Sequence, residues 1–265
     1  MNIPPDFSNL CTLTSRDGIP LACDCRGQGE PLLMFVHGWT CRRMYWLSQL
    51  DCFSASHAVA APDLPGHGDS GCGTRTRWGV ESFARDVADC VGALGPKKVI
   101  LVGHSMGGAV ALEAARLLGA TVAGVVLVDT FVIDYGGILP DTVQAIATPF
   151  HDDFAAAMAA LVEQTATAAT PSDLKAQLIR EMSAADPAWA LPTWRDLLAW
   201  SPKAAFSELR VPIHAINGDL IPASARERCA PFVSEILIPG AGHFLQMEDP
   251  SGFNRVLENV LTRLR

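Results

Sequence analysis

The chain has 265 residues, a length that suits one large α/β domain with room for a single insertion. Hydrophobic residues make up 49% of it and charged residues 18%, so a large buried core is expected and intrinsic disorder is not. The formal net charge is −8 and no run of lysine or arginine occurs, which argues against a nucleic-acid-binding surface and an anionic-membrane surface.

The predicted strands are of two kinds. Residues 10–14 and 19–25 form two short β segments, and the Asp17-Gly18 pair between them is a hairpin turn signal. The later candidates are continuously apolar rather than alternating, which indicates burial on both faces, as in the centre of a parallel sheet. They cover residues 31–36, 58–61, 99–102, 122–128, 211–216 and 236–238.

Amphipathic helical patterns separate these strands. Phe83, Val87 and Val91 recur at a spacing of four residues and therefore lie on one face of a helix. Apolar residues between Phe253 and Leu264 line one face of a C-terminal helix in the same way. Strands that alternate with helices predict a mostly parallel sheet covered on both faces.

One long stretch breaks this alternation. Between residues 131 and 206 no strand-like run occurs, and short helical patterns are separated by prolines. We therefore expect a core domain formed by residues 1–130 and 207–265, and a helical cap formed by residues 131–206 over one edge of the sheet. The prolines are Pro140, Pro149, Pro171, Pro187, Pro192 and Pro202.

The strongest chemical signal is a Gly-x-Ser-x-Gly sequence at residues 103–107, placed between a buried strand and a helix. The turn is too tight for a side chain at Gly103 or Gly107. It places the hydroxyl of Ser105 at a helix N-terminus, where the helix dipole favours developing negative charge. Ser105 is therefore the predicted nucleophile.

These features together resemble the α/β-hydrolase family, in its serine esterase and lipase branch, over essentially the whole chain. The resemblance implies a mostly parallel central sheet with helices on both faces and an inserted helical cap. Residues 37–39, after the third predicted strand, match the family's oxyanion loop. The resemblance makes the backbone N–H groups of Trp39 and Met106 the oxyanion-hole donors, and both residues are candidates for lining the substrate pocket.

The family's histidine loop has a counterpart at residues 240–244, which read Gly-Ala-Gly-His-Phe after the last predicted strand. The resemblance makes His243 the general base, in a loop on the same side of the sheet as the nucleophile. His37 is expected to brace the oxyanion loop and His104 to shape the nucleophile turn. His67 lies in a glycine-rich turn that we interpret as structural.

Two positions are open for the acid that orients the imidazole and stabilises the imidazolium. The commoner family position follows the strand that ends near Gly218, usually as Gly-x-x-Asp, whereas here Asp219 directly follows Gly218 in a shortened loop. The second position is the end of the preceding strand, where Asp129 stands 24 residues after Ser105. The haloalkane dehalogenases, which the chain resembles in this respect, place their acid at about that separation.

The function implied is a cofactor-independent hydrolase of carboxylic esters, lactones included, which forms an acyl-enzyme on Ser105. Its expected partner is a small-molecule ester or lactone, and the chain is expected to be a monomer or homodimer. A serine nucleophile argues against dehalogenase and epoxide hydrolase chemistry. C–C bond hydrolases, amidases and acyltransferases remain alternatives, as does a non-catalytic ligand-binding protein on the same scaffold.

The eight cysteines show no Cys-x-x-Cys spacing, and the N-terminal residues do not read as a signal peptide. We therefore expect a cytoplasmic protein without a bound metal, whose cysteines are reduced and mostly fill space in the core. Cys23 and Cys25 come nearest to a metal-like spacing, and alternation places both on one face of a strand. No apolar run approaches the roughly 20 residues that a membrane helix needs.

Overall fold

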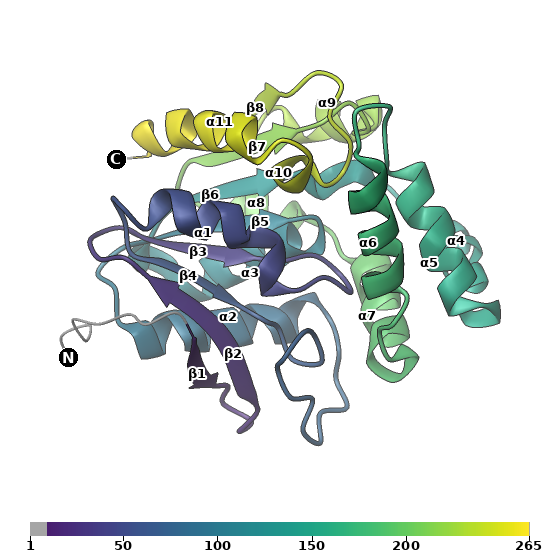
Figure 1. The fold of residues 1–265 in the computed structure, drawn as a ribbon, viewed down its shortest axis with the longest axis horizontal. Helices are drawn as coiled ribbons and strands as arrows, with labels where there is room; N and C mark the ends of the chain where they lie inside the picture. Colours follow the sequence, from purple (N-terminus) through teal and green to yellow (C-terminus); the bar gives the residue numbers. More distant parts are fainter. Residues whose placement is uncertain (1–9, 265) are drawn as a thin grey trace.

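The computed structural model describes residues 10–264, and within this range eight strands form one sheet (Figure 1). The strands are β1 (Cys11–Thr14), β2 (Pro20–Arg26), β3 (Leu32–Val36), β4 (Val59–Pro62), β5 (Val99–His104), β6 (Val122–Val128), β7 (Ile213–Asn217) and β8 (Ser234–Leu237). Their order in the sheet is β1-β2-β4-β3-β5-β6-β7-β8. The pairs β1–β2 and β2–β4 are antiparallel and all the others are parallel, which confirms the predicted fold class.

The central strands are buried on both faces, as their continuous hydrophobicity predicts. Every residue of β3 and β5 is buried, and alternate side chains face opposite sides of the sheet. Leu33 and Phe35 pack on one side with Trp46. Met34 and Val36 pack into the hydrophobic cluster on the other side. Burial on both faces explains why residues 32–36 and 99–103 include no polar side chain, and only His104 at the end of β5 is polar.

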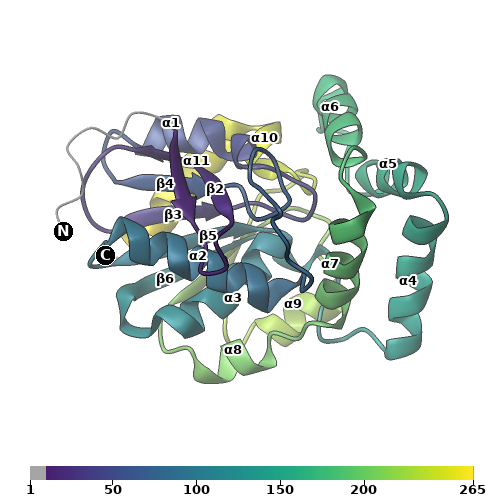
Figure 2. The same cartoon turned by 90° about the horizontal axis from the view of Figure 1, so that it is seen from below.

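Helices cover both faces of the sheet (Figure 2). On one face lie α1 (Leu47–Phe53) and α11 (Pro250–Thr262), and on the other lie α2 (Val80–Leu94), α3 (Met106–Leu118) and α8 (Lys203–Glu208). Two short helices, α9 (Ala223–Cys229) and α10 (Leu245–Glu248), follow β7 and β8. The remaining helical turns are η1 (Arg43–Trp46), η2 (Gly119–Thr121) and η3 (Thr130–Val132).

Four further helices lie between β6 and β7: α4 (Pro140–Asp152), α5 (Phe154–Gln164), α6 (Ser172–Met182) and α7 (Pro187–Ala199). We call this segment, residues 140–199, the helical insertion. Its helices lie together at one end of the sheet (Figure 1). The expected boundary at residue 206 falls inside α8, which packs against α3 and is tied to it by an ion pair between Glu208 and Arg116.

Two of the prolines lie inside helices rather than between them. Pro149 is in α4 and Pro192 is in α7. Pro140 and Pro187 occupy the first turn of a helix, where a missing N–H costs little because that group has no intrahelical acceptor. A proline in a helix interior removes a hydrogen bond, and the buried face of α7, which includes Trp194, offsets that loss.

Among residues 10–264, no helix is both long enough and apolar enough to cross a membrane.

Candidate active site

Ser105 lies at the turn between β5 and α3 with backbone angles φ 54° and ψ −123°, a strained conformation for a residue other than glycine. Two backbone hydrogen bonds hold this turn. The N–H of Ser105 donates to the carbonyl of Val128 at 2.9 Å, and the N–H of Gly108 donates to the carbonyl of Ser105 at 2.9 Å. A side chain at Gly107 would collide with the carbonyl of Val36, so the close packing of α3 on β3 requires glycine there.

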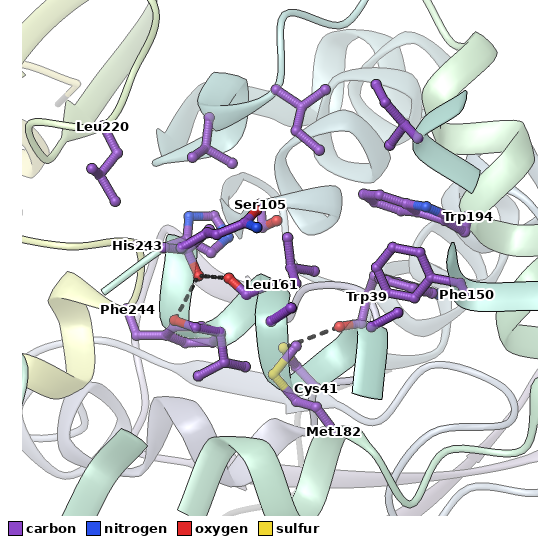
Figure 3. Close-up of a pocket in the computed structure, with 18 of the residues that line it drawn as sticks. Trp39, Cys41, Ser105, Phe150, Leu161, Met182, Trp194, Leu220, His243 and Phe244 are labelled. Carbon is purple, nitrogen blue, oxygen red and sulfur yellow. Dashed lines mark hydrogen bonds between the residues drawn. The ribbon is translucent and has the colours of Figure 1, made fainter. Parts of the chain in front are cut away.

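A carboxylate–imidazole pair belongs to the same end of the sheet. Asp129, the first residue after β6, is fully buried, and its Oδ2 lies 2.7 Å from Nδ1 of His243. Its Oδ1 accepts a hydrogen bond from the N–H of Gly218 at 2.8 Å, so both carboxylate oxygens have a donor. Because Nδ1 of His243 is engaged by Asp129, Nε2 is left for the pocket that His243 and Ser105 both line (Figure 3).

The other candidate acid, Asp219, does not contact His243. Its side chain is exposed, and its Oδ2 accepts a hydrogen bond from the N–H of Gly240 at 2.8 Å. Its own N–H donates to the carbonyl of Ala241 at 3.1 Å. Gly218 packs so closely on the histidine loop that a side chain there would meet the carbonyl of Ala241. The shortened loop therefore leaves Asp219 to anchor the start of the histidine loop, and Asp129 faces the imidazole.

The two predicted oxyanion donors stand close to Ser105. A Cβ added at Gly38 would lie 3.2 Å from Cβ of Ser105, so the loop that carries Trp39 packs on the nucleophile turn. Met106 is the first residue of α3, where an N–H has no intrahelical acceptor. Within residues 10–264, the backbone N–H groups of Trp39 and Met106 donate to no carbonyl or side chain. Cys41, which carried no sequence signal, donates from Sγ to the carbonyl of Trp39 at 3.3 Å.

A pocket of about 590 Å³ lies between the sheet and the helical insertion. Trp39 lines it, whereas the side chain of Met106 is fully buried in the core and does not. Trp39 stacks on Trp194 of α7 with ring centroids 4.4 Å apart, and its Nε1 donates to the carbonyl of Ala190 at 2.9 Å. Among residues 10–264, no aspartate, glutamate, lysine or arginine lines it, so the pocket is suited to an uncharged ligand. Its apolar lining includes Ile146, Phe150, Leu161, Val162, Met182 and Phe244.

The helical insertion holds the backbone of the histidine loop. The N–H of His243 donates to the carbonyl of Thr165 at 2.9 Å, and Oγ1 of Thr167 donates to the carbonyl of Gly240 at 2.7 Å. Both threonines lie just after α5, in a segment that no motif singled out. Hydrogen bonds to backbone atoms leave no residue-type signature, which is why sequence reasoning missed them.

Glu248 of α10 also links the histidine loop to the helical insertion. Its Oε2 accepts from the N–H of Gly242 at 2.7 Å, and its Oε1 accepts from Oγ1 of Thr170 at 2.9 Å. One carboxylate thus joins the histidine loop to the segment after α5. The position of His243 therefore depends on the insertion as well as on Asp129.

Two further histidines are buried around the site. Nδ1 of His37 lies 2.8 Å from the carbonyl of Gly38, and its Nε2 accepts from the N–H of Leu64 at 3.0 Å, so His37 joins the loop that carries Trp39 to the segment after β4. Nε2 of His104 lies 2.8 Å from the carbonyl of His243 and donates to it. Burial lowers the pKa of both His37 and His104, so both are neutral at pH 7.

The buried histidines predict acid-dependent stability. Burial lowers the pKa of His67 and His104 well below the ordinary value near 6.5. Below that pH the unfolded chain binds protons that the folded chain does not, so the free energy of unfolding falls as the pH falls. From pH 7 to 5.5 we expect a loss of about 2 to 3 kcal/mol from these two groups, measured by urea unfolding.

The matched pair of variants is His67→Gln and His151→Gln, because His151 is exposed on α4. The first should remove about half of this pH dependence and the second should leave it unchanged. An identical pH dependence in the two variants would contradict the assignment of a buried, neutral His67.

Comparison with known proteins places the chain in a family. Its sequence matches the model of the alpha/beta hydrolase family over residues 33–256. A non-heme chloroperoxidase from Kitasatospora aureofaciens is 36% identical over 107 residues, which are 40% of this chain and 37% of that protein. The chain spans between 26% and 63% of the length of the first curated relatives that it matches.

Two solved structures have the same fold over nearly the whole chain. A thermophilic esterase from Thermogutta terrifontis superimposes with a TM-score of 0.82 at 23% identity, covering 97% of this chain and 99% of that one. An enzyme described as degrading N-acyl homoserine lactones gives 0.81 at 22% identity, covering 94% of this chain and 99% of that one. The family match extends from β3 into α11 and contains Ser105, Asp129 and His243. The chain belongs to the α/β-hydrolase family.

Proposed function

We propose that the protein is a cofactor-independent serine hydrolase that cleaves carboxylic ester bonds, lactones included, through an acyl-enzyme on Ser105. The observation that carries the proposal is the fully buried carboxylate of Asp129, whose Oδ2 lies 2.7 Å from Nδ1 of His243. A buried carboxylate with two hydrogen-bond donors orients the imidazole of His243 so that it can act as a base. His243 and Ser105 line the same pocket.

The proposed reaction has two halves. Oγ of Ser105 attacks the carbonyl carbon while its proton passes to Nε2 of His243, and the N–H groups of Trp39 and Met106 bind the oxyanion. Each such donor is typically worth about 3 kcal/mol in the transition state. Collapse expels the alcohol, which takes the proton from His243 and leaves an ester on Ser105. Water, deprotonated by His243, then attacks the carbonyl carbon of that ester. As the intermediate collapses, His243 returns the proton to Oγ of Ser105 and the acid is released.

The pocket favours a neutral, largely apolar substrate. In the part of the chain that the structure describes, no aspartate, glutamate, lysine or arginine lines it, and aromatic and aliphatic side chains of the insertion form much of its wall. Carboxylic esters and lactones satisfy this requirement because they are uncharged and carry an electrophilic carbonyl carbon. A volume of about 590 Å³ is in the range of small-molecule sites.

A panel of 4-nitrophenyl esters with acyl chains of two to about twelve carbons tests this proposal. We expect turnover with a maximum at a short or medium chain, and complete loss of turnover after treatment with a serine-directed inhibitor. A ligand-binding protein on the same scaffold would give no turnover above that of a Ser105→Ala sample, and that result would refute the proposal.

Phe150 is expected to limit the length of the acyl chain. Its ring lines the pocket and packs edge-on against Trp39 at 5.3 Å between centroids. Phe150→Ala should raise the kcat/KM ratio of long-chain to acetyl ester by about tenfold, because a few added methylenes in an apolar pocket are worth 1 to 3 kcal/mol. Phe232→Ala, at an exposed phenylalanine outside the pocket, is the control and should leave the ratio unchanged.

Loss of the Glu248 carboxylate is expected to slow the reaction without weakening substrate binding. Glu248→Ala removes the acceptor shared by Gly242 and Thr170, which loosens the loop that carries His243. A misplaced base lowers kcat, here by about 10- to 100-fold, while KM changes little because the pocket wall is intact. The measurement is the kcat and KM of a 4-nitrophenyl ester.

The control for Glu248→Ala is Thr148→Val, in α4 of the helical insertion. Oγ1 of Thr148 donates to the carbonyl of Gln144, one turn earlier in α4, and does not contact the histidine loop. Thr148→Val should retain the wild-type kcat. Equal kcat values for wild type and Glu248→Ala would show that the insertion does not position His243.

A further inference from the structure

Three cysteines converge at the β1 edge of the sheet. Cys11 of β1 stands opposite Cys23 of β2 in the antiparallel register, and Cys25 follows on the same face of β2. Sγ of Cys25 lies 2.8 Å from Sγ of Cys11 and 3.6 Å from Sγ of Cys23. All three sulfur atoms lie within 4.8 Å of one another. None of the three residues lines the pocket that contains Ser105.

The three-cysteine cluster can be reached from solvent at Cys11. Cys23 and Cys25 are buried, whereas Cys11 is only half-buried and gives solvent a route to the cluster. The three neighbouring sulfur atoms thus offer three soft ligands that solvent reaches at Cys11.

A disulfide does not account for this arrangement. Cys23 and Cys25 are separated by one residue of a single strand, so their Cβ atoms are too far apart for a disulfide between them. Cys11 is a free thiol in the structure, as are Cys23 and Cys25. A metal ion with metal–sulfur bonds of about 2.3 Å needs sulfur atoms about 3.8 to 4.0 Å apart. The Cys25–Cys23 separation of 3.6 Å is close to this, whereas Cys11 and Cys25, at 2.8 Å, have to move apart by about 1 Å to bind the ion.

We propose that Cys11, Cys23 and Cys25 bind one thiophilic d10 metal ion, Zn(II) or Cu(I), through three thiolates. Three metal–sulfur bonds form, and each thiol that is still protonated releases its proton to solvent. Soft thiolate ligands select these ions over hard cations such as Mg(II). The ion joins β1 to β2 and takes no part in the chemistry at Ser105, so the site is independent of the proposed hydrolase activity.

The test is a titration of the reduced, metal-free full chain under anaerobic conditions, in two arms. Zn(II) and Cu(I) are added separately in competition with a chromophoric chelator of each ion. We expect one ion per chain in at least one arm, and the arm that saturates identifies the ion. Cys11→Ser and Cys25→Ser should weaken that binding by at least about 100-fold, the upper end of what losing even an outer-shell partner costs.

Cys52→Ser and Cys72→Ser are the matched controls, because both cysteines are exposed and lie outside the cluster. They should bind the ion as tightly as wild type. The melting temperature of the wild-type protein should rise with the bound ion, a readout that does not depend on how well the variants fold. No uptake in either arm, or uptake that persists unchanged in Cys25→Ser, would overturn the proposal. So would a reduced protein that forms a Cys11–Cys25 disulfide in air but never takes up an ion.

Discussion

Ser105→Ala is expected to lower kcat on a short-chain ester by a factor of about 10⁴ to 10⁶. The proposed reaction has no substitute for the serine hydroxyl, because the acyl group is carried on its oxygen. The remaining rate should come from binding and from the oxyanion donors alone. The measurement is the steady-state kcat of a 4-nitrophenyl ester, with the active fraction of wild type determined by burst titration.

The fold of Ser105→Ala should be intact. The turn at residue 105 is held by backbone hydrogen bonds to Val128 and Gly108, and alanine retains both of those groups. Circular dichroism and the melting temperature should therefore match those of the wild type. A folded Ser105→Ala protein with wild-type turnover would eliminate the acyl-enzyme mechanism.

Asp129→Asn is expected to lower kcat by about 10⁴, the loss that the same substitution causes in serine proteases. An asparagine has only one carbonyl oxygen. If that oxygen accepts from the N–H of Gly218, the amide NH2 faces Nδ1 of His243, and if it faces Nδ1 instead, the hydrogen bond from Gly218 is lost. The imidazole then adopts the wrong tautomer, or its protonated form loses a buried counter-charge. The measurement is kcat at pH 7 on the same ester.

Asp219→Asn is the matched control, since Asp219 is the other acid that the sequence offered. Its oxygen accepts from the N–H of Gly240, and an asparagine oxygen can do the same. We expect this variant to keep most of the wild-type kcat. A large loss in Asp219→Asn together with an active Asp129→Asn would reverse the assignment of the acid.

The sheet and the nucleophile turn could be predicted from the sequence because their signals are local. Continuous apolar runs indicate strands buried on both faces, and β3 to β7 lie where those runs predict them within about two residues. The turn at Ser105 requires glycine at Gly103, because a side chain there would meet the carbonyl of Gly107 in the same turn. Constraints of this kind restrict the residue type at each position, so they can be recognised in one sequence.

The pairing of Asp129 with His243 could not be predicted, because it depends on a contact between two loops. Both candidate acids follow a strand at the same edge of the sheet, so strand positions alone do not separate them. The close packing of Gly218 on the histidine loop excludes Asp219 and supplies an N–H to Asp129. That contact exists only once the two loops are folded, so no sequence pattern indicates it.

Parts of the helical insertion could not be predicted from the sequence either. Pro192 was expected to separate helices, yet α7 continues through it because tertiary packing outweighs the local preference. The carbonyl of Thr165, which accepts from the N–H of His243, is a backbone group that any residue could supply. The cluster of three cysteines depends on the register of β1 on β2, which places Cys11 opposite Cys23 and which the sequence does not specify.

Labelling with a serine-directed fluorophosphonate, followed by peptide mapping, tests most directly whether Ser105 is the nucleophile. We expect one adduct per chain, located on Ser105, with loss of ester turnover in proportion to labelling. We expect no adduct on the Ser105→Ala protein. An adduct on any other residue that abolishes turnover, or full turnover by a protein that the probe does not label, would contradict the account.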